Sequence, residues 1–324
     1  MTLQTSTDWR PTATIDALRL RAALLARARE HFAATGALEV ETPVMVQAAV
    51  TDVHLESLEV RRADGSRAGF LHTSPEYGMK RLLCAGSPDI YQIAHVFREG
   101  ERGRRHNPEF TMIEWYRLGI DHHALMTDVE RLLRALLEPH RPVAETRRVT
   151  YADAFRAALD LDPLDCSTQE LRAAMLARGT DVPDSIAGER DALLDLAMAT
   201  LVATAFPADC ITFMHDFPAS QAALAQVRGP VASRFEAFWG DLELANGFHE
   251  LGDAVEQAGR FAADRADRRR RGQPDREPDA RFLGALEAGL PPCAGVALGF
   301  DRVVMIAARA RRIDDVLSFP VERS

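Results

Sequence analysis

Long apolar runs are missing from this sequence of 324 residues, although hydrophobic residues make up 47% of it. No stretch approaches the roughly 18 to 20 apolar residues that a helix needs to span a bilayer. The N-terminal segment MTLQTSTDWRP has neither the basic start nor the apolar stretch of a secretory signal. We therefore expect a protein without membrane association that works in the cytoplasm.

Cysteine is scarce, and basic charge is not in excess. The four cysteines, Cys84, Cys166, Cys210 and Cys293, stand far apart without the paired spacing of zinc or redox sites, so we expect reduced packing residues. The net charge of −9 gives no general electrostatic footprint for nucleic acid, although a local basic patch is compatible with it. The composition therefore does not favour extensive nucleic-acid binding.

The densest group of charged, turn-forming and aromatic residues runs from Phe97 to Arg117, FREGERGRRHNPEFTMIEWYR. Apolar alternation before it and the run from Phe110 to Trp115 predict two strands joined by a charged loop. Such a frame would hold Arg98 rigidly while the arginines of the loop move, an arrangement suited to clamping phosphates. From the loop alone, an exposed hairpin with solvated arginines is the alternative.

Three segments resemble the signature motifs of class II aminoacyl-tRNA synthetases, in the expected order. GALEVETPVM, from Gly36 to Met45, is similar to motif 1, the segment from Phe97 to Arg117 to motif 2 of lysyl-tRNA synthetase, and GVALGFDRVVM, from Gly295 to Met305, to motif 3. The resemblance covers nearly the whole chain. It implies an α+β catalytic domain in which helices flank an antiparallel sheet, the use of ATP, and a homodimer formed through motif 1.

A second group of candidate site residues lies in the segment ELANGFHE, in which Glu243 and Glu250 are seven residues apart, an odd number. In an unbroken strand they would face opposite sides, because side chains alternate. A bulge at Asn246-Gly247 would restore a common face, and a tight Asn-Gly turn would set the pair opposite each other. We favour the bulge, because Gly240-Asp241 already offers a turn. Converging carboxylates need a cation or a substrate ammonium between them, and Mg²⁺ bound to ATP phosphates fits. Two unrelated exposed glutamates are the alternative.

The resemblance also assigns roles at matching positions. Arg98 and Arg302 would be the catalytic residues that contact the phosphates, and Phe110 would stack beneath adenine. The residues implied to bind ATP are Arg98, Glu99, Gly100, His106, Asn107, Phe110, Glu243, Leu244, Gly299 and Arg302. Those implied to bind the amino acid are Ser74, Pro75, Glu76, Tyr116, Glu250 and Ala297, with Glu243 and Glu250 as Mg²⁺ ligands. The FRNE pattern of the family is altered here to Phe97-Arg98-Glu99-Gly100-Glu101. This change leaves open whether Glu99 or Glu101 contacts adenine.

Helical patterns dominate two regions outside the motifs. An amphipathic helix is expected from Ile15 to Phe32, and a helical insertion near residues 121–206, with helices at 124–137, 151–158, 168–178 and 190–205. In the insertion, His122 and His123 are adjacent, so we expect surface residues rather than metal ligands, because a helix cannot direct both at one point. The arginines from Arg260 to Arg271 are expected on a solvated helix end, with a docking surface as the alternative.

Fewer than twenty residues precede the first helix, where lysyl-tRNA synthetases carry an OB-fold domain that binds the anticodon. We therefore expect a single domain over residues 1–324, no anticodon-binding domain, and tRNA as an unlikely substrate. The resemblance is closest to the stand-alone paralogue of the lysyl-tRNA synthetase catalytic domain that modifies translation elongation factor P. It implies an ATP-dependent ligase that activates (R)-β-lysine, or a lysine-like amino acid, as an adenylate and transfers it to a lysine side chain of that factor.

Two alternatives stay open at this point, a truncated enzyme that charges tRNA with lysine and a regulatory paralogue without catalysis. Retained Arg98, Glu243, Glu250 and Arg302 speak against the second. Ala297 stands where the tRNA-charging enzymes have glycine, so an extra methyl group approaches the amino-acid pocket. A methyl group in a tight pocket changes specificity by about 1 to 3 kcal/mol, and we expect an isomer other than α-lysine.

Overall fold

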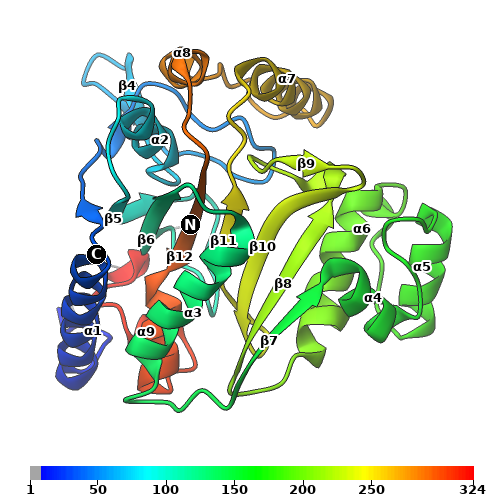
Figure 1. The fold of residues 1–324 in the computed structure, drawn as a ribbon, viewed down its shortest axis with the longest axis horizontal. Coiled ribbons are helices and arrows are strands. Elements are labelled where there is room, and N and C mark those ends of the chain that lie inside the picture. Colours follow the sequence, from blue (N-terminus) through cyan, green and yellow to red (C-terminus); the bar gives the residue numbers. More distant parts are fainter. Residues whose placement is uncertain (1–8) are drawn as a thin grey trace.

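The computed structural model describes residues 9–324, and in this range the chain is organised around one nine-stranded sheet (Figure 1). The order across it is β1 (Leu38–Glu39), β5 (Ile90–Phe97), β6 (Glu109–Leu118), β12 (Cys293–Gly299), β11 (Leu242–His249), β10 (Val231–Trp239), β8 (Cys210–Pro218) and β7 (Glu145–Thr150), and β9 (Val227–Arg228) pairs with β10. The end pairs, β1 with β5 and β7 with β8, are parallel, and the pairs between them are antiparallel. The expected α+β fold with a largely antiparallel sheet is confirmed.

Residues 1–8, which make up most of the segment examined for a secretory signal, lie outside the described range. Among the residues that are described, no helix combines the length and the apolar character needed to cross a bilayer. All four cysteines are free thiols, as expected, and Cys210 and Cys293 are buried.

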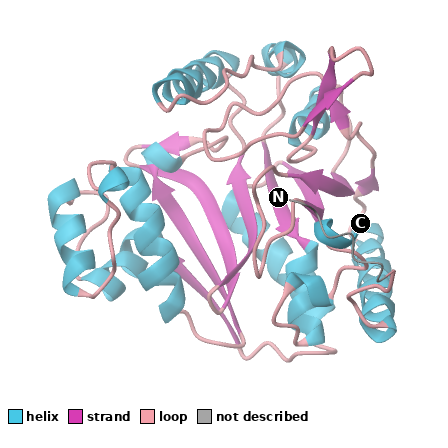
Figure 2. Ribbon diagram, turned by 180° about the vertical axis from the view of Figure 1, so that it is seen from behind, coloured by secondary structure: helices cyan, strands magenta, loops and turns pink. Residues whose placement is uncertain are grey.

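One face of the sheet is covered by α1 (Ile15–Ala34), α3 (His122–Leu137) and α9 (Phe300–Ala308), and the largest core lies between these helices and the strands (Figure 1). Because side chains alternate along a strand, β12 contributes side chains to both faces of the sheet. Ala294, Val296 and Leu298 pack into this core, whereas Ala297 and Gly299 line a cavity on the other side. Seen from behind, that other side carries loops rather than a layer of helices over its central strands (Figure 2).

The expected helical insertion of residues 121–206 divides into three parts. α3 belongs to the main core, and residues 145–150 form β7, a strand that was not predicted. A second helical unit consists of α4 (Tyr151–Leu159), α5 (Thr168–Ala177), α6 (Arg190–Ala197), a π-helix (Met198–Val202) and a 3₁₀ turn (Ala203–Ala205). Its core includes Met214 and Phe217 of β8 and Phe238 of β10. The strand escaped prediction because β7 is an edge strand whose charged side chains are mostly exposed, which hides the apolar alternation.

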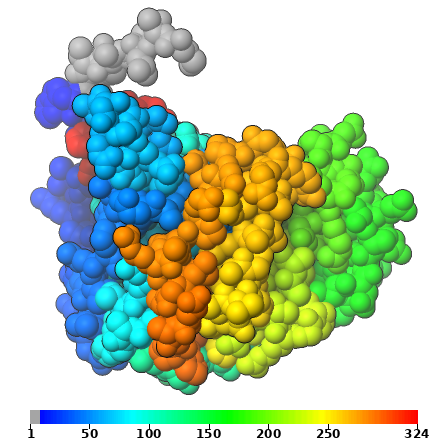
Figure 3. Space-filling view, turned by 90° about the horizontal axis from the view of Figure 1, so that it is seen from above, coloured from blue at the N-terminus to red at the C-terminus, as the bar shows by residue number. Residues whose placement is uncertain are grey.

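Residues of α2 (Glu76–Cys84), α7 (Ala254–Arg270), α8 (Ala280–Ala288) and β2 (Met45–Val46) line the cavity. β2 belongs to a small sheet with β4 (Arg67–Leu71) and β3 (Glu59–Arg61). Viewed from above, the segment of α7 and α8 lies between the N-terminal part of the chain and the α4–α6 unit (Figure 3).

α1 begins as predicted, because the hydroxyl of Thr14 accepts a hydrogen bond from the amide of Ala17. The expectation of a solvated arginine end on α7 is wrong at Arg268. This side chain is fully buried, donates to the carbonyl oxygens of Asp52 and Pro274, and pairs with the carboxylate of Glu56. Arg268 therefore anchors the loop before β3 instead of facing a partner.

Candidate active site

A cavity of about 1060 Å³ lies on the loop-covered face of the sheet. It collects residues from motifs 2 and 3, from ELANGFHE and from the start of α2, although these segments are far apart in the sequence. The expected site residues that line it are Ser74, Pro75, Glu76, Arg98, Glu101, His106, Asn107, Phe110, Glu243, Leu244, Ala297, Gly299 and Arg302. Glu99, Gly100, Tyr116 and Glu250 are not among the lining residues.

Arg302, in the first turn of α9, is fixed from two sides. Its Nη1 donates to the carbonyl oxygen of Glu243 at 2.7 Å and lies 3.6 Å from the Glu243 carboxylate, and its Nη2 contacts His106 Nε2 at 2.7 Å. Burial, and then the charge of Arg302, hold the pKa of His106 below its usual range. A neutral imidazole accepts from the guanidinium, so motif 2 and motif 3 are joined by a hydrogen bond rather than separated by repulsion.

Arg98, at the end of β5, lies over the ring of Phe110 with 5.1 Å between the guanidinium carbon and the ring centroid. Its Nη1 is 3.5 Å from Glu101 Oε1. Glu101 lines the cavity, whereas Glu99 is exposed outside it, so of the two glutamates only Glu101 faces the expected nucleotide pocket. Gly100 is exposed as well and has a φ of +79°, a turn conformation that suits glycine.

Asn107 has a structural task in this arrangement. It is 3% exposed, its amide donates to the carbonyl oxygen of Glu109 at 2.7 Å, and its Oδ1 accepts from the amide of Val321 at 3.2 Å. These bonds tie the motif 2 loop to the C-terminal segment of the chain.

The predicted bulge in ELANGFHE exists, but its position was wrong. Ala245 pairs with Ala237 and Glu243 with Phe238, so Leu244 is the extra residue, while Asn246 and Gly247 pair regularly. Because the bulge adds one residue to the strand, Glu243 lies on the same face of β11 as Asn246, and both line the cavity. It does not make Glu243 a partner of Glu250, whose carboxylate is engaged elsewhere.

Next to the cavity lies a group that we call the lysine cluster, Lys80 with Glu76, Glu114 and Glu250. Lys80 is 0% exposed, and its Nζ is 2.6 Å from Glu76 Oε1 and 2.6 Å from Glu250 Oε2. Burial acts against the ammonium charge, yet the two carboxylates raise the pKa of Lys80 above its usual value. The expectation that Glu250 binds Mg²⁺ conflicts with this pairing, because its side chain is 1% exposed, has Lys80 as its partner and does not line the cavity.

Glu114 completes the lysine cluster from β6. Its Oε2 accepts from the hydroxyl of Ser74 at 2.6 Å and its Oε1 from the hydroxyl of Tyr116 at 2.7 Å. Burial, with the charge of Glu76 next, raises the pKa of Glu114 to about 7. Burial also raises the pKa of Glu250 to about 8, against the opposing effect of Lys80. Three carboxylates thus share one ammonium in a water-poor site, which leaves them short of positive charge.

Lys80 and Glu114 were missed from the sequence, although each leaves a trace there. Lys80 is the only lysine among 39 basic residues, a signal that composition alone could have flagged. Glu114 lies two residues from Tyr116 and four from Phe110, so strand alternation puts it on the same face as both. Neither trace reveals burial, which depends on the packing of α2 over β5, β6 and β12.

Motif 3 approaches the lysine cluster so closely that only glycine fits at residue 295. A Cβ atom there would lie 2.3 Å from the Tyr116 ring and 2.5 Å from Glu250 Oε1. Two residues on, Ala297 lies opposite Glu114 on β6 and opposite Asn246 on β11. The methyl group of Ala297 therefore sits on the strand face that leads from the cavity to the lysine cluster.

Comparison with known proteins agrees with this geometry. A family model for tRNA synthetases class II (D, K and N) matches residues 4–323. The chain is 47% identical over 322 residues to elongation factor P–(R)-β-lysine ligase of Vibrio parahaemolyticus, covering 97% of this chain and 98% of that protein. It is 46% identical over 328 residues to the ligase of that name from Vibrio cholerae (99% and 100% covered) and 45% identical over 325 residues to that from Yersinia enterocolitica (98% and 98%).

A family match over almost every residue, and relatives of this identity aligned from end to end, leave no large part of the chain outside the comparison. The chain belongs to the class II tRNA synthetase family, in the group whose similar curated members are elongation factor P–(R)-β-lysine ligases.

Proposed function

We propose that this protein is an ATP-dependent ligase that activates (R)-β-lysine as an adenylate and transfers it to a lysine side chain of translation elongation factor P. The relatives that carry this name share 44–47% of their residues with the chain. The observation that carries the proposal is the lysine cluster, because its charge matches a substrate with ammonium groups.

The charge of the lysine cluster can be counted directly. Three carboxylates, Glu76, Glu114 and Glu250, face one ammonium, Lys80, so the ionised cluster has an excess of two negative charges. (R)-β-lysine carries two ammonium groups. Their arrival would stabilise the ionised forms of Glu114 and Glu250, whose pKa values burial and neighbouring carboxylates have raised in the free protein.

The nucleotide half of the cavity supports binding of ATP. Arg98 and Arg302 both line it, and Arg302 is held in place by His106 and Glu243. The donor set fits one Mg²⁺ ligand, because the Glu243 side chain is 43% exposed toward the cavity and Mg²⁺ prefers one or two carboxylates together with substrate phosphates. Bound with ATP, Mg²⁺ would supply charge neutralisation at the phosphates.

The chemistry then needs no nucleophilic side chain. The carboxylate of the amino acid attacks the α-phosphorus of ATP, the new oxygen–phosphorus bond forms, and pyrophosphate leaves. Arg98 and Arg302 contribute by binding the phosphates in one orientation and stabilising the charge that develops on the transferring group. The amine of the acceptor lysine next attacks the carbonyl carbon of the adenylate, and AMP leaves as an amide bond forms.

Ala297 supports an isomer other than α-lysine, since its methyl group faces the route from the nucleotide to the lysine cluster. An amino group displaced by one carbon would avoid this methyl and still reach the carboxylates. Replacement by glycine should relax the preference for the β-isomer by about 1 to 3 kcal/mol.

We also propose one catalytic domain over residues 1–324 that acts as a homodimer through motif 1. The short β1 forms an edge of the sheet, and nearby Leu38, Val44 and Met45 are 52%, 40% and 47% exposed. Apolar side chains of this size at a sheet edge are typical of an interface. An acceptor that serves translation implies a cytoplasmic place of action.

The deciding experiment compares both isomers and both acceptors. Pyrophosphate exchange should be faster with (R)-β-lysine than with α-lysine, and intact-mass analysis should show elongation factor P gaining one lysyl residue. The Ala297→Gly variant should shift the isomer preference toward α-lysine, and Arg302→Ala should serve as the inactive control. Charging of lysine tRNA with α-lysine, without a mass gain on elongation factor P, would overturn the proposal.

A further inference from the structure

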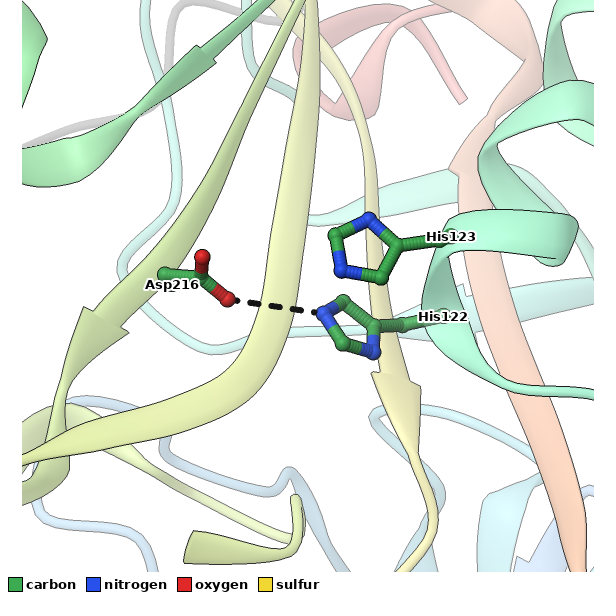
Figure 4. A group of neighbouring side chains, drawn as sticks. All are labelled: His122, His123 and Asp216. Atoms are coloured by element: carbon green, nitrogen blue, oxygen red, sulfur yellow. Dashed lines mark ion pairs between the residues drawn. The ribbon is translucent and has the colours of Figure 1, made fainter. Parts of the chain in front are cut away.

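Three side chains gather where α3 begins beside the end of β8, and we call them the histidine cluster: His122, His123 and Asp216 (Figure 4). The expectation that the two adjacent histidines diverge is wrong. In the first turn of α3 both rings project toward β8, with 4.1 Å between their centroids. None of the three lines the active-site cavity.

The spacing suits a single small cation. One potential ligand atom from each residue lies within 4.8 Å of the others, and His122 Nε2 is 3.5 Å from Asp216 Oδ1. Two ligands of a tetrahedral zinc ion, each bonded at about 2.0 to 2.1 Å, are roughly 3.4 Å apart. The pair formed by His122 and Asp216 already has this separation, and a small rotation of the more exposed His123 would bring the third ligand in.

His122 gives independent evidence that something is bound here. Its side chain is 7% exposed, yet neither ring nitrogen makes a hydrogen bond within the described part of the chain. Buried polar atoms are rarely left without partners, because the cost of removing them from water is not recovered. A ligand at Nε2 would resolve that deficit.

His215 holds Asp216 and His123 in place. His215 Nδ1 lies 3.0 Å from Asp216 Oδ2 and fixes the carboxylate, as outer partners do around metal sites. The His123 ring packs edge-on against His215, with 5.1 Å between the ring centroids. Neutral imidazoles and a carboxylate are the forms that bind metal.

We propose that His122, His123 and Asp216 form a binding site for one divalent transition-metal ion, best suited to Zn²⁺. Two imidazoles and one carboxylate favour zinc over Mg²⁺ or Ca²⁺, which prefer oxygen ligands. The fourth position would open on the side of His123, which is exposed. The ion would fasten the start of α3 in the main core to β8, the strand that packs against the α4–α6 unit.

The test uses untagged full-length protein stripped of metal with a chelator, without ATP. Calorimetric titration with ZnCl₂ should give one ion per chain, and thermal unfolding should shift upward with Zn²⁺. His122→Ala and Asp216→Asn should each weaken binding by at least ~10-fold and lose the thermal shift. Asparagine tolerates the φ of +60° at residue 216, so this variant keeps the backbone. His140→Ala, a histidine elsewhere in the chain, is the matched control.

Cobalt gives a second readout, because tetrahedral Co²⁺ absorbs visible light in a way that the free ion does not. Wild type and His140→Ala should show this absorption and the two cluster variants should not. Lack of stoichiometric Zn²⁺ binding by wild type, or equal binding by wild type, His122→Ala and Asp216→Asn, would overturn the proposal. If His122→Ala fails to fold, Asp216→Asn carries the comparison alone.

Discussion

Replacing Lys80 with methionine removes the only cation of the lysine cluster and keeps a side chain of similar length. Lys80 is 0% exposed and pairs with two carboxylates at 2.6 Å. Removing one partner of a buried ion pair costs about 3 to 5 kcal/mol, because the other partner is left uncompensated. We expect Lys80→Met to lose this amount of unfolding free energy near pH 8.

The unfolding free energy lost in Lys80→Met should increase as pH rises. In wild type, Glu114 and Glu250 have pKa values raised to about 7 and about 8, so the folded state holds protons that the unfolded chain releases near its ordinary pKa. Their contribution to stability is present at low pH and is lost as pH rises through 7 and 8. Without Lys80 the folded cluster binds roughly one more proton, so the deficit should grow by about 1.4 kcal/mol per pH unit.

The assay is chemical unfolding of wild type and variant at pH 6, 7 and 8. Arg81→Met is the matched control, since Arg81 is the next residue on α2 but is exposed, and its loss should stay within roughly 0.5 kcal/mol. A Lys80→Met protein as stable as wild type at pH 8, or a deficit that does not change with pH, would refute the charge balance derived for the lysine cluster.

Further predictions concern the cavity and the lysine cluster next to it. Arg98→Ala and Arg302→Ala should each lower lysine-dependent pyrophosphate exchange by at least ~100-fold, and near-normal rates in both would contradict their assignment to the phosphates. The KM for the amino acid should fall as pH rises from 6 to 8, because an arriving ammonium displaces protons from Glu114 and Glu250, whose pKa values are about 7 and about 8. Calorimetry in two buffers should detect the released protons, and a KM that does not change with pH would count against the mechanism. Gly295→Ala should raise that KM and cost about 1 to 3 kcal/mol of stability, whereas Gly284→Ala, where a Cβ meets nothing within 4 Å, should not. Glu243→Gln should change the Mg²⁺ dependence of exchange, and an unchanged titration curve would exclude it as a ligand.

The sequence by itself was sufficient to predict the strands, helix and turn that depend on residues close together in the chain. Hydrophobic periodicity predicted β5, β6 and α1, and the order of three motifs indicated the family. Gly240 supplied the turn between β10 and β11, with a φ of +56°. Such features follow from backbone conformation and side-chain period, which a short stretch carries within itself.

Only the tertiary structure decided which charged groups meet. Lys80 and Glu250 are brought together because α2 packs over β5, β6 and β12, and Glu250, buried beside Lys80, does not line the cavity where the Mg²⁺ site was expected. The bulge at Leu244 depends on register with β10, and the contact of His122 with Asp216 depends on how α3 lies beside β8. Burial and long-range pairing set the charge and pKa of these groups, because both depend on residues that are distant in the chain and adjacent in space.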